Sequence, residues 1–247
     1  MPSLGVQPGD RAALFTCFGG CARPLVLATL RDRLGYGLGP LLPRSAPPPV
    51  ARPTAVPFAA VIERLWSKAI PDHPRLRAYL QFRGLSGAVP PALRLHPACL
   101  YLEVGQPRRW LPAMLARFVR PDGSVTGLHR MYLDPNGPGK AAVPTPKKFL
   151  GRVAGSSIQL AEGVETALAV AEGVETALAV AEARGGPVWA AGSAGGLAVM
   201  ELPPGLHLLE IWSDPDPAGR AAAGRLAARA QRRGIRVELF IPRRLGA

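Results

Sequence analysis

Two aspartates lie two residues apart in the segment IWSDPDPAGR, directly after an apolar run and directly before a long Ala/Arg-rich stretch. Side chains two positions apart point the same way in an extended chain, so Asp214 and Asp216 can face one site at the end of a strand. Hard oxygen ligands suit Mg²⁺, which keeps several waters and meets phosphate oxygens. Pro217 then favours the start of a helix, whose free N–H groups would lie beside the site. A simple turn with an Asp cap is the alternative that this pair alone leaves open.

A third carboxylate, Glu172, follows a short apolar run and precedes Gly173 in the segment AVAEGVETALAV. Gly173 lets the backbone turn sharply, and a helix with a buried apolar stripe is expected over 174–184. In a parallel sheet the carboxyl ends of neighbouring strands meet at one edge, so Glu172 can come next to the Asp pair. The three acids together predict a Mg²⁺ site for phosphoryl-transfer chemistry.

The decapeptide AEGVETALAV occurs twice in tandem, so either Glu162 or Glu172 is a candidate for the functional glutamate. If Glu162 has this role, the helix after it must run on through Gly173, where Gly costs about 1 kcal/mol relative to Ala. If Glu172 has it, 167–171 becomes a buried strand and the helix over 174–184 has an ordinary length. We therefore predict Glu172, with the first copy folded as turn and strand and the second as helix.

Strand and helix patterns alternate from residue 156 onward. Such alternation predicts a parallel sheet with right-handed crossovers and helices on both faces. In sheets of this kind the chemistry lies at the carboxyl ends of the strands. The predicted strands are 167–171, 188–191, 207–212 and 237–241, and the predicted helices are 174–184, 194–200 and 217–233.

The chain ahead of this sheet has a different pattern. Prolines crowd the segment 40–57 and exclude a helix or a central strand, which predicts a linker. Apolar residues at helical spacing then predict helices beginning at Phe58 and over 75–83, while runs at 113–119 and 124–132 around a Pro-Asp-Gly turn predict a β-hairpin. The expected fold class is therefore α/β, a parallel sheet preceded by a smaller α+β region with a β-hairpin.

The net charge of +13 is confined to one part of the chain. Residues 1–150 hold 20 Lys and Arg against 7 Asp and Glu, whereas residues 151–247 hold 10 of each. The basic residues 1–150 would attract a polyanion such as nucleic acid. The clustered acids of residues 151–247 would bind a cation that takes part in the reaction on this polyanion. Arg-rich coding bias is the alternative reading, since only 4 of the 30 basic residues are Lys. No long apolar segment or leader pattern occurs and cysteines number only 3, so we expect a cytoplasmic protein without a membrane partner.

At the acidic residues the chain resembles the Toprim family, the domain shared by topoisomerases, bacterial primases and some nucleases. The likeness is carried by Glu172-Gly173 and by a later DxDxxG with Asp214, Asp216 and Gly219. EGVETAL, PVWAAGSAGG and SDPDPAGR are similar to Toprim-containing primase-like proteins of phages and plasmids. RAYLQFRGL, LRLHPAC and GLHRMYLDPNGPGKA resemble the region before Toprim in those proteins. The resemblance implies a general acid or base at Glu172 and two aspartates that hold Mg²⁺.

The resemblance also implies how the chain divides. The segment TCFGGCARPLVLATLR, with Cys17 and Cys21, is similar to the last third of a zinc ribbon. The other two ligands are missing, so we do not expect zinc. The predicted division is a zinc-ribbon-like remnant at 1–39, the linker at 40–57, a basic primase-associated α+β region at 58–154 and a Toprim domain at 155–247.

The function expected from these features is Mg²⁺-dependent phosphoryl transfer on nucleic acid, of the DNA-primase type in the replication of a mobile element. There are two alternatives: a Toprim nuclease, and a truncated non-catalytic remnant that binds nucleic acid. The expected partners are DNA or RNA, nucleoside triphosphates and a separate replicative helicase, since the sequence has no Walker A motif. The candidate contacts to nucleic acid or nucleotide are basic residues, namely Arg130, Lys140, Lys147, Lys148 and Arg220.

The histidines and Cys99 are weaker candidates. Their spacing matches no metal-ligand pattern. Surface or capping roles are therefore predicted for the histidines, and a buried or half-buried thiol is predicted for Cys99. The histidines are His73, His96, His129 and His207.

Overall fold

The computed structural model describes residues 4–8, 13–17, 28–29, 58–85, 89–161, 163–164 and 166–241. The chain forms two compact units, Met1–Ala55 and Val56–Ala247. In the first unit, β1 (Leu4–Pro8) pairs with β2 (Ala13–Cys17) in an antiparallel two-stranded sheet. Cys21, the segment 40–57 and Glu162 lie outside the described residues, so the zinc-ribbon and linker assignments stay predictions.

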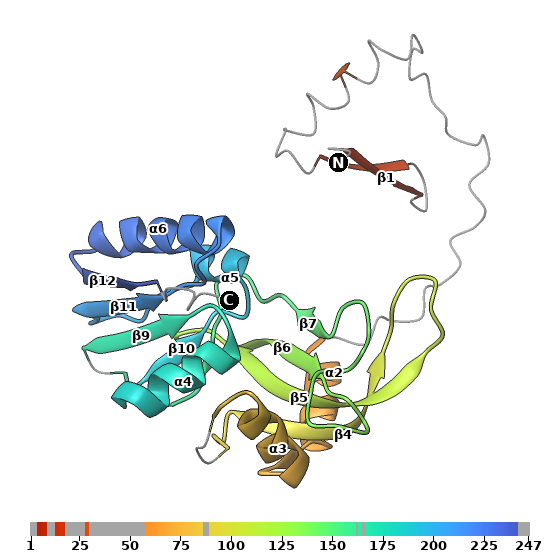
Figure 1. Ribbon diagram of the computed structural model, residues 1–247. Coiled ribbons are helices and arrows are strands. Elements are labelled where there is room, and N and C mark those ends of the chain that lie inside the picture. Colours follow the sequence, from red (N-terminus) through yellow and green to blue (C-terminus); the bar gives the residue numbers. More distant parts are fainter. Residues whose placement is uncertain are drawn as a thin grey trace. The chain divides into compact units, whose positions relative to one another are not determined.

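The second unit begins with a five-stranded antiparallel sheet in the order β3-β4-β5-β6-β7 (Figure 1). β5 and β6 form the hairpin that the Pro-Asp-Gly turn predicts. β4 and β7 flank this hairpin and were not predicted. β4 is interrupted by Pro97, where its register with β5 shifts, and the sequence KKFLG of β7 lacks the alternation typical of a half-buried strand. The elements are α2 (Phe58–Ser67), β3 (Ile70–Pro71), α3 (Pro74–Phe82), β4 (Leu93–Tyr101), β5 (Arg109–Val119), β6 (Val125–Tyr132) and β7 (Lys147–Gly151).

The central strand β5 is buried on both faces, because α2 and α3 contribute to different cores. Leu115 joins a cluster with Trp66 of α2. Met114, its neighbour in the chain, joins another cluster with Leu76 and Tyr79 of α3. Successive side chains of a strand point to opposite faces, so this alternation places the two helices on opposite sides of the sheet.

A second five-stranded sheet follows, in the order β12-β11-β9-β10-β8. β12, β11, β9 and β10 are parallel, and β8 is an antiparallel edge strand beside β10. This arrangement confirms the predicted α/β fold class. The elements are β8 (Ile158–Gln159), β9 (Ala167–Ala171), α4 (Val174–Arg184), β10 (Val188–Ala190), α5 (Ala194–Val199), β11 (Leu208–Trp212), α6 (Pro217–Gln231) and β12 (Arg236–Phe240).

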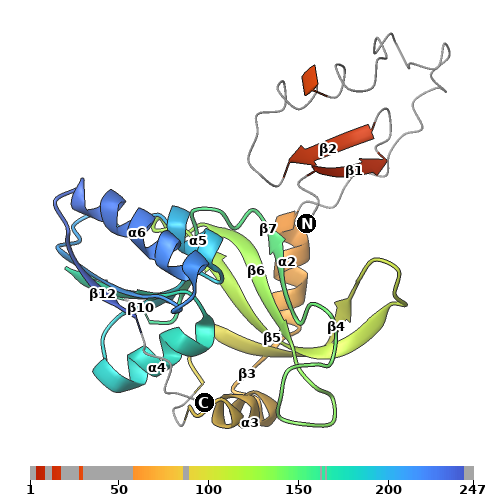
Figure 2. The same cartoon turned by 45° about the horizontal axis from the view of Figure 1, so that its top comes forward.

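Helices cover both faces of this parallel sheet (Figure 2). Leu168 and Val170 of β9 pack in a cluster with residues of α5 and α6. Ala169 and Ala171, which point the other way, pack in a cluster with residues of α4. Strands buried on both faces have continuous apolar sequences, which explains why β9 could be predicted from ALAVA.

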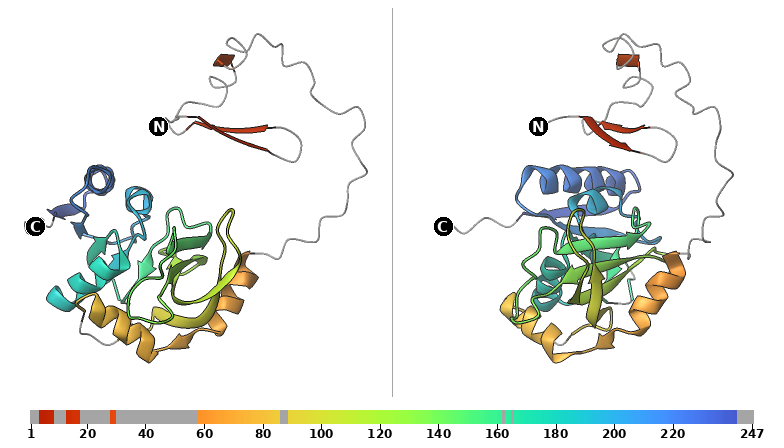
Figure 3. Two further views of the ribbon diagram at one scale, coloured as in Figure 1. Left: turned by 45° about the vertical axis from the view of Figure 1, so that its right-hand side comes forward. Right: turned by 90° about the vertical axis from the view of Figure 1, so that its right-hand side faces the viewer.

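One hydrophobic cluster joins the antiparallel sheet to the parallel sheet. Tyr79, Met114 and Phe118 from the first pack with Ile158 and Val174 from the second. Helices α3 and α4 lie side by side at this joint (Figure 3). The two regions therefore share a core, which fixes their relative positions. In the described part of the chain, no helix has both the length and the apolar character needed to cross a membrane.

Candidate active site

The three predicted acids lie at the carboxyl ends of two neighbouring strands. Glu172 follows β9, whereas Asp214 and Asp216 follow β11. β9 and β11 are hydrogen-bonded neighbours, with Ala171 opposite Trp212. The charges of both aspartates act on the Glu172 carboxyl. The structure therefore brings the three carboxylates to one edge of the sheet.

The DxDxxG turn is shaped by the first turn of α6. Asp216 caps this helix, and its Oδ1 accepts a 2.7 Å hydrogen bond from the N–H of Gly219. A Cβ at Gly219 would lie 2.6 Å from the carbonyl oxygen of Asp214. The helix therefore approaches the backbone of Asp214 more closely than any side chain allows. This contact holds the two aspartates in place between strand and helix.

Glu172 is half-buried, and its Oε2 is buried without a hydrogen-bond partner. Burial raises the pKa of Glu172 above its usual value, and the charges of Asp214 and Asp216 raise it further. Lys147 and the backbone N–H of Ala194 act in the opposite direction. The Glu172 carboxyl therefore binds a proton more readily than an ordinary glutamate does.

The donor chemistry of this edge suits Mg²⁺, a hard cation that prefers carboxylate oxygens. Glu172 has an unpartnered buried oxygen, and it is repelled by two further carboxylates that a divalent cation would neutralise. Among the residues that the structure describes, no group of three or more His, Cys, Asp and Glu side chains is gathered closely enough to hold a metal ion. The acids are thus neighbours with the right donor atoms, but their side chains do not form a closed ligand set.

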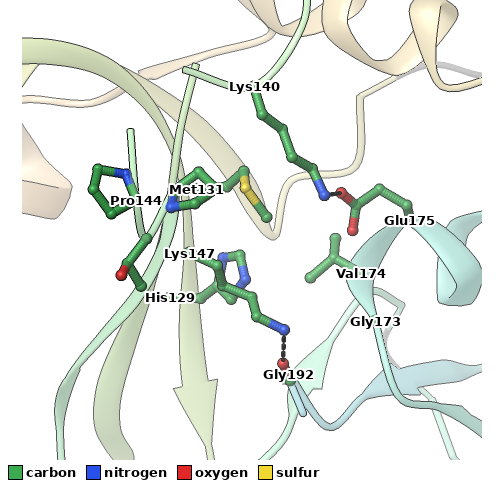
Figure 4. Close-up of a pocket in the computed structure, with 11 residues that line it drawn as sticks. His129, Met131, Lys140, Pro144, Lys147, Gly173, Val174, Glu175 and Gly192 are labelled. Atoms are coloured by element: carbon green, nitrogen blue, oxygen red, sulfur yellow. Dashed lines mark hydrogen bonds and ion pairs between the residues drawn. The ribbon is translucent and has the colours of Figure 1, made fainter. Parts of the chain in front are cut away.

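A pocket of about 350 Å³ opens beside Gly173 and the start of α4. Two lysines from the antiparallel region line it (Figure 4). Lys147 of β7 donates a 2.9 Å hydrogen bond to the carbonyl oxygen of Gly192. The Nζ of Lys140 lies 3.3 Å from Oε1 of Glu175. Two lysine side chains therefore form the wall of the pocket that faces the parallel sheet.

The other predicted basic contacts have different environments. Lys148, which is also part of β7, forms a 3.0 Å ion pair with Glu103. The guanidinium of Arg130 donates to the hydroxyl of Tyr132 at 3.1 Å within the antiparallel sheet. Arg220 is exposed in the first turn of α6. Of the five predicted basic contacts, only Lys140 and Lys147 line the pocket. Lys147 and Lys148 are consecutive residues of strand β7.

The structure confirms the predicted surface or capping role for some of the histidines but not for all of them. His73 caps α3, as expected, and its Nδ1 accepts from the N–H of Arg75 at 3.1 Å. The predicted surface or capping role is wrong for His129, which is 1% exposed. It lies in β6, and its ring packs against Phe118 and Phe149. Because both faces of β6 are buried at this position, its sequence has no alternation of apolar and polar residues that would indicate which side chains are buried. Cys99 is a buried free thiol, as predicted.

His129 also lines the pocket, and its Nδ1 is buried without a hydrogen-bond partner. Burial lowers the pKa of His129 to about 4, and the charges of Lys147, Lys140 and Arg130 lower it as well, against the opposing charge of Glu175. The imidazole is therefore neutral near pH 7. His96 is buried too, and its Nδ1 accepts from the N–H of Ala98 at 3.2 Å.

Comparisons with known proteins agree with this architecture. Residues 157–246 match the Toprim domain family, and residues 58–160 match a domain of unknown function, DUF7146. No curated protein sequence matches the chain significantly.

Two solved structures resemble the fold. A DNA primase domain from Pseudomonas aeruginosa is 16% identical, with a TM-score of 0.51 over 77% of this chain and 72% of that chain. The DnaG catalytic core is 14% identical, with a TM-score of 0.50 over 76% of this chain and 71% of that chain. At these identities the likeness concerns the fold. Residues 157–246 therefore form a Toprim domain, and the fold of the chain is similar to that of DNA primase domains.

Proposed function

We propose that this protein is a Mg²⁺-dependent nucleotidyltransferase of the DNA-primase type, which joins nucleoside triphosphates on a DNA template. The observation that carries the proposal is the position of Glu172 beside Asp214 and Asp216, with an unpartnered buried oxygen at the carboxyl edge of the sheet. The Toprim domain and the primase-type fold support a function on nucleic acid. The lysine-lined pocket next to this edge supports a phosphate-bearing substrate.

Asp214, Asp216 and Glu172 are the residues that would hold Mg²⁺. When bound there, Mg²⁺ supplies charge neutralisation and alignment of the attacking and leaving oxygens in phosphoryl transfer. Asp216 keeps its helix-capping bond to Gly219, so its carboxylate is oriented before any substrate arrives. The site would thus be pre-organised by the start of α6.

The chain's own residues then have distinct roles in the reaction. Lys140 and Lys147 attract the triphosphate through charge. The 3′-hydroxyl oxygen of one nucleotide forms a bond to the α-phosphorus of the next, the bond to the bridging oxygen breaks, and pyrophosphate leaves. Glu172 accepts the hydroxyl proton through the carboxylate oxygen that the cation leaves free.

Incorporation of radiolabelled nucleotides on a single-stranded DNA template tests the proposal. We expect Mg²⁺-dependent products from the wild type and a loss of at least about 100-fold in Asp214→Asn, because charge stabilisation of the transition state is lost. Glu238→Gln, at the partly exposed edge strand β12, is the matched control and should keep full activity. Shortening of a labelled strand without new synthesis would instead identify a Toprim nuclease.

Metal binding can be measured without turnover. Mg²⁺ should raise the melting temperature of the wild type, because a ligand that binds only the folded state stabilises it. Asp214→Asn should lose most of this increase, and Glu238→Gln should retain it. A protein that neither responds to Mg²⁺ nor forms either product would be a non-catalytic nucleic-acid-binding remnant, and the proposal would fail.

A further inference from the structure

The hairpin formed by β4 and β5 carries an exposed apolar and cationic tip, which comprises the connecting loop and the first two residues of β5. Leu102, Val104 and Trp110 are 52%, 97% and 66% exposed. Arg108 and Arg109 are exposed beside them. Within the described part of the chain, neither guanidinium forms an ion pair or a side-chain hydrogen bond. This group of five residues, the hairpin tip, is therefore unpartnered and bears an uncompensated positive charge.

The base of the same hairpin is firmly held. Glu103 accepts a 2.8 Å hydrogen bond from the hydroxyl of Tyr101 and a 3.0 Å bond from Nζ of Lys148. Hydrogen bonds from Lys148, Tyr101 and Thr145 lower the pKa of Glu103 to about 2, so this acid stays ionised. Its charge is already paired with Lys148 and does not neutralise the tip. The hairpin is therefore tied to β7, the strand that also provides Lys147 to the candidate active site.

Trp110 differs from the other tryptophans of the described residues. Trp66 and Trp189 are only 6% and 3% exposed, and Trp212 is partly buried against a core cluster. A tryptophan with two-thirds of its surface in water contributes little to packing in its own fold. Its large flat face is free to stack on another ring.

We propose that the hairpin tip binds single-stranded DNA, with Trp110 stacked on a base and with Arg108 and Arg109 in contact with the phosphates. Unpaired strands offer the faces of their bases, whereas a duplex hides them, and an aromatic face with adjacent cations is the chemistry that binds single strands. Charge complementarity favours DNA over a protein partner, because the paired Glu103 leaves the tip purely cationic. The inference rests on the proposed function, in which this strand is the template.

Fluorescence anisotropy with a labelled oligothymidine tests the proposal on the full chain, in EDTA so that catalysis has no part. We expect Trp110→Ala to weaken binding at least about 5-fold and Trp110→Phe to restore most of the affinity, since stacking of one base has this size. Arg108→Ala combined with Arg109→Ala should weaken binding and reduce its salt dependence. Quenching of intrinsic tryptophan fluorescence by the oligonucleotide should disappear in Trp110→Phe.

Phe82→Ala is the matched control, because Phe82 is an aromatic residue on α3 with 63% exposure. It should bind DNA as the wild type does. Unchanged affinity in Trp110→Ala would overturn the proposal and would point to a protein partner for the tip, even if nucleotide incorporation is observed. Trp110-dependent binding without nucleotide incorporation would leave the hairpin tip as a DNA site and reject the primase activity instead.

Discussion

The hydroxyl of Tyr79 on α3 donates a 2.5 Å hydrogen bond to Oε1 of Glu175 in the first turn of α4. Lys140 lies 3.3 Å from the same oxygen. Burial alone would raise the pKa of Glu175, but the hydrogen bond from Tyr79 and the charge of Lys140 hold it below the usual value. An ionised carboxylate therefore joins the antiparallel region to the Toprim domain, close to the candidate active site.

This bond predicts a measurable contribution to stability. Tyr79→Phe keeps the buried ring but removes the donor to a charged acceptor, so the free energy of unfolding should fall by about 1.5–3 kcal/mol. Urea unfolding measures this change. In a double-mutant cycle, Glu175→Gln should make the loss from Tyr79→Phe smaller, because the charged acceptor is then absent. Equal losses in both backgrounds would show that the negative charge of Glu175 does not strengthen the bond, and no loss in Tyr79→Phe would show that the bond does not stabilise the fold.

The two copies of EGVET provide a second prediction with a built-in control. Glu172→Gln should abolish Mg²⁺-dependent nucleotide incorporation, because it removes the carboxylate at the end of β9 that interacts with Asp214. Glu162→Gln is the matched control, because Glu162 occupies the same position in the first copy of the decapeptide. We expect it to retain activity. Loss of activity only in Glu162→Gln would show that the first copy supplies the functional glutamate.

The duplicated decapeptide shows how far local sequence determines this fold. ALAV is part of β9 in the first copy and part of α4 in the second. Because the two ALAV segments have the same intrinsic helix and strand propensities, their tertiary surroundings determine which one forms a strand and which one forms a helix. The prediction succeeded because the alternation of elements and Gly173 restricted the possible arrangements. The same reasoning placed Glu172 next to the aspartates, since sheet order follows from topology.

Other features depend on contacts that no local pattern contains. β7 pairs with β6, and its sequence KKFLG resembles a basic loop until that partner is known. Tyr79 and Glu175 are far apart in the chain, so their hydrogen bond leaves no sequence signal. His129 is buried because both faces of β6 are covered, which requires the second sheet to be in place. Non-local packing therefore accounts for most of what the sequence could not predict.

His129 predicts a pH dependence of stability. Its pKa is about 4 in the folded protein, mainly because of burial, and about 6.5 in an unfolded chain. Between these values the unfolded chain binds a proton that the folded chain does not, so the free energy of unfolding falls as the pH falls. From pH 7.5 to pH 5.0 this group should contribute a loss of about 2 kcal/mol.

Urea unfolding at these two pH values, in the wild type and in His129→Gln, isolates this contribution. The variant has no imidazole to titrate, so its decline should be smaller by about 2 kcal/mol. Burial also lowers the pKa of His96, but His96 is present in both proteins and cancels in the comparison. Identical declines would mean that His129 titrates normally in the folded protein.

Two glycines of α6 predict opposite responses to the same substitution. Gly219→Ala places a Cβ 2.6 Å from the carbonyl oxygen of Asp214, a backbone atom that can move only if the DxDxxG turn moves. We expect a loss of about 1–3 kcal/mol in the free energy of unfolding, as for other overpacked sites, together with a loss of Mg²⁺-dependent activity. Gly224→Ala meets nothing within 4 Å and should stabilise the helix by up to about 1 kcal/mol, because Ala is the better helix former. Urea unfolding of both variants checks the prediction, and a Gly219→Ala protein as stable and active as Gly224→Ala would show that the close approach of α6 to Asp214 is not required.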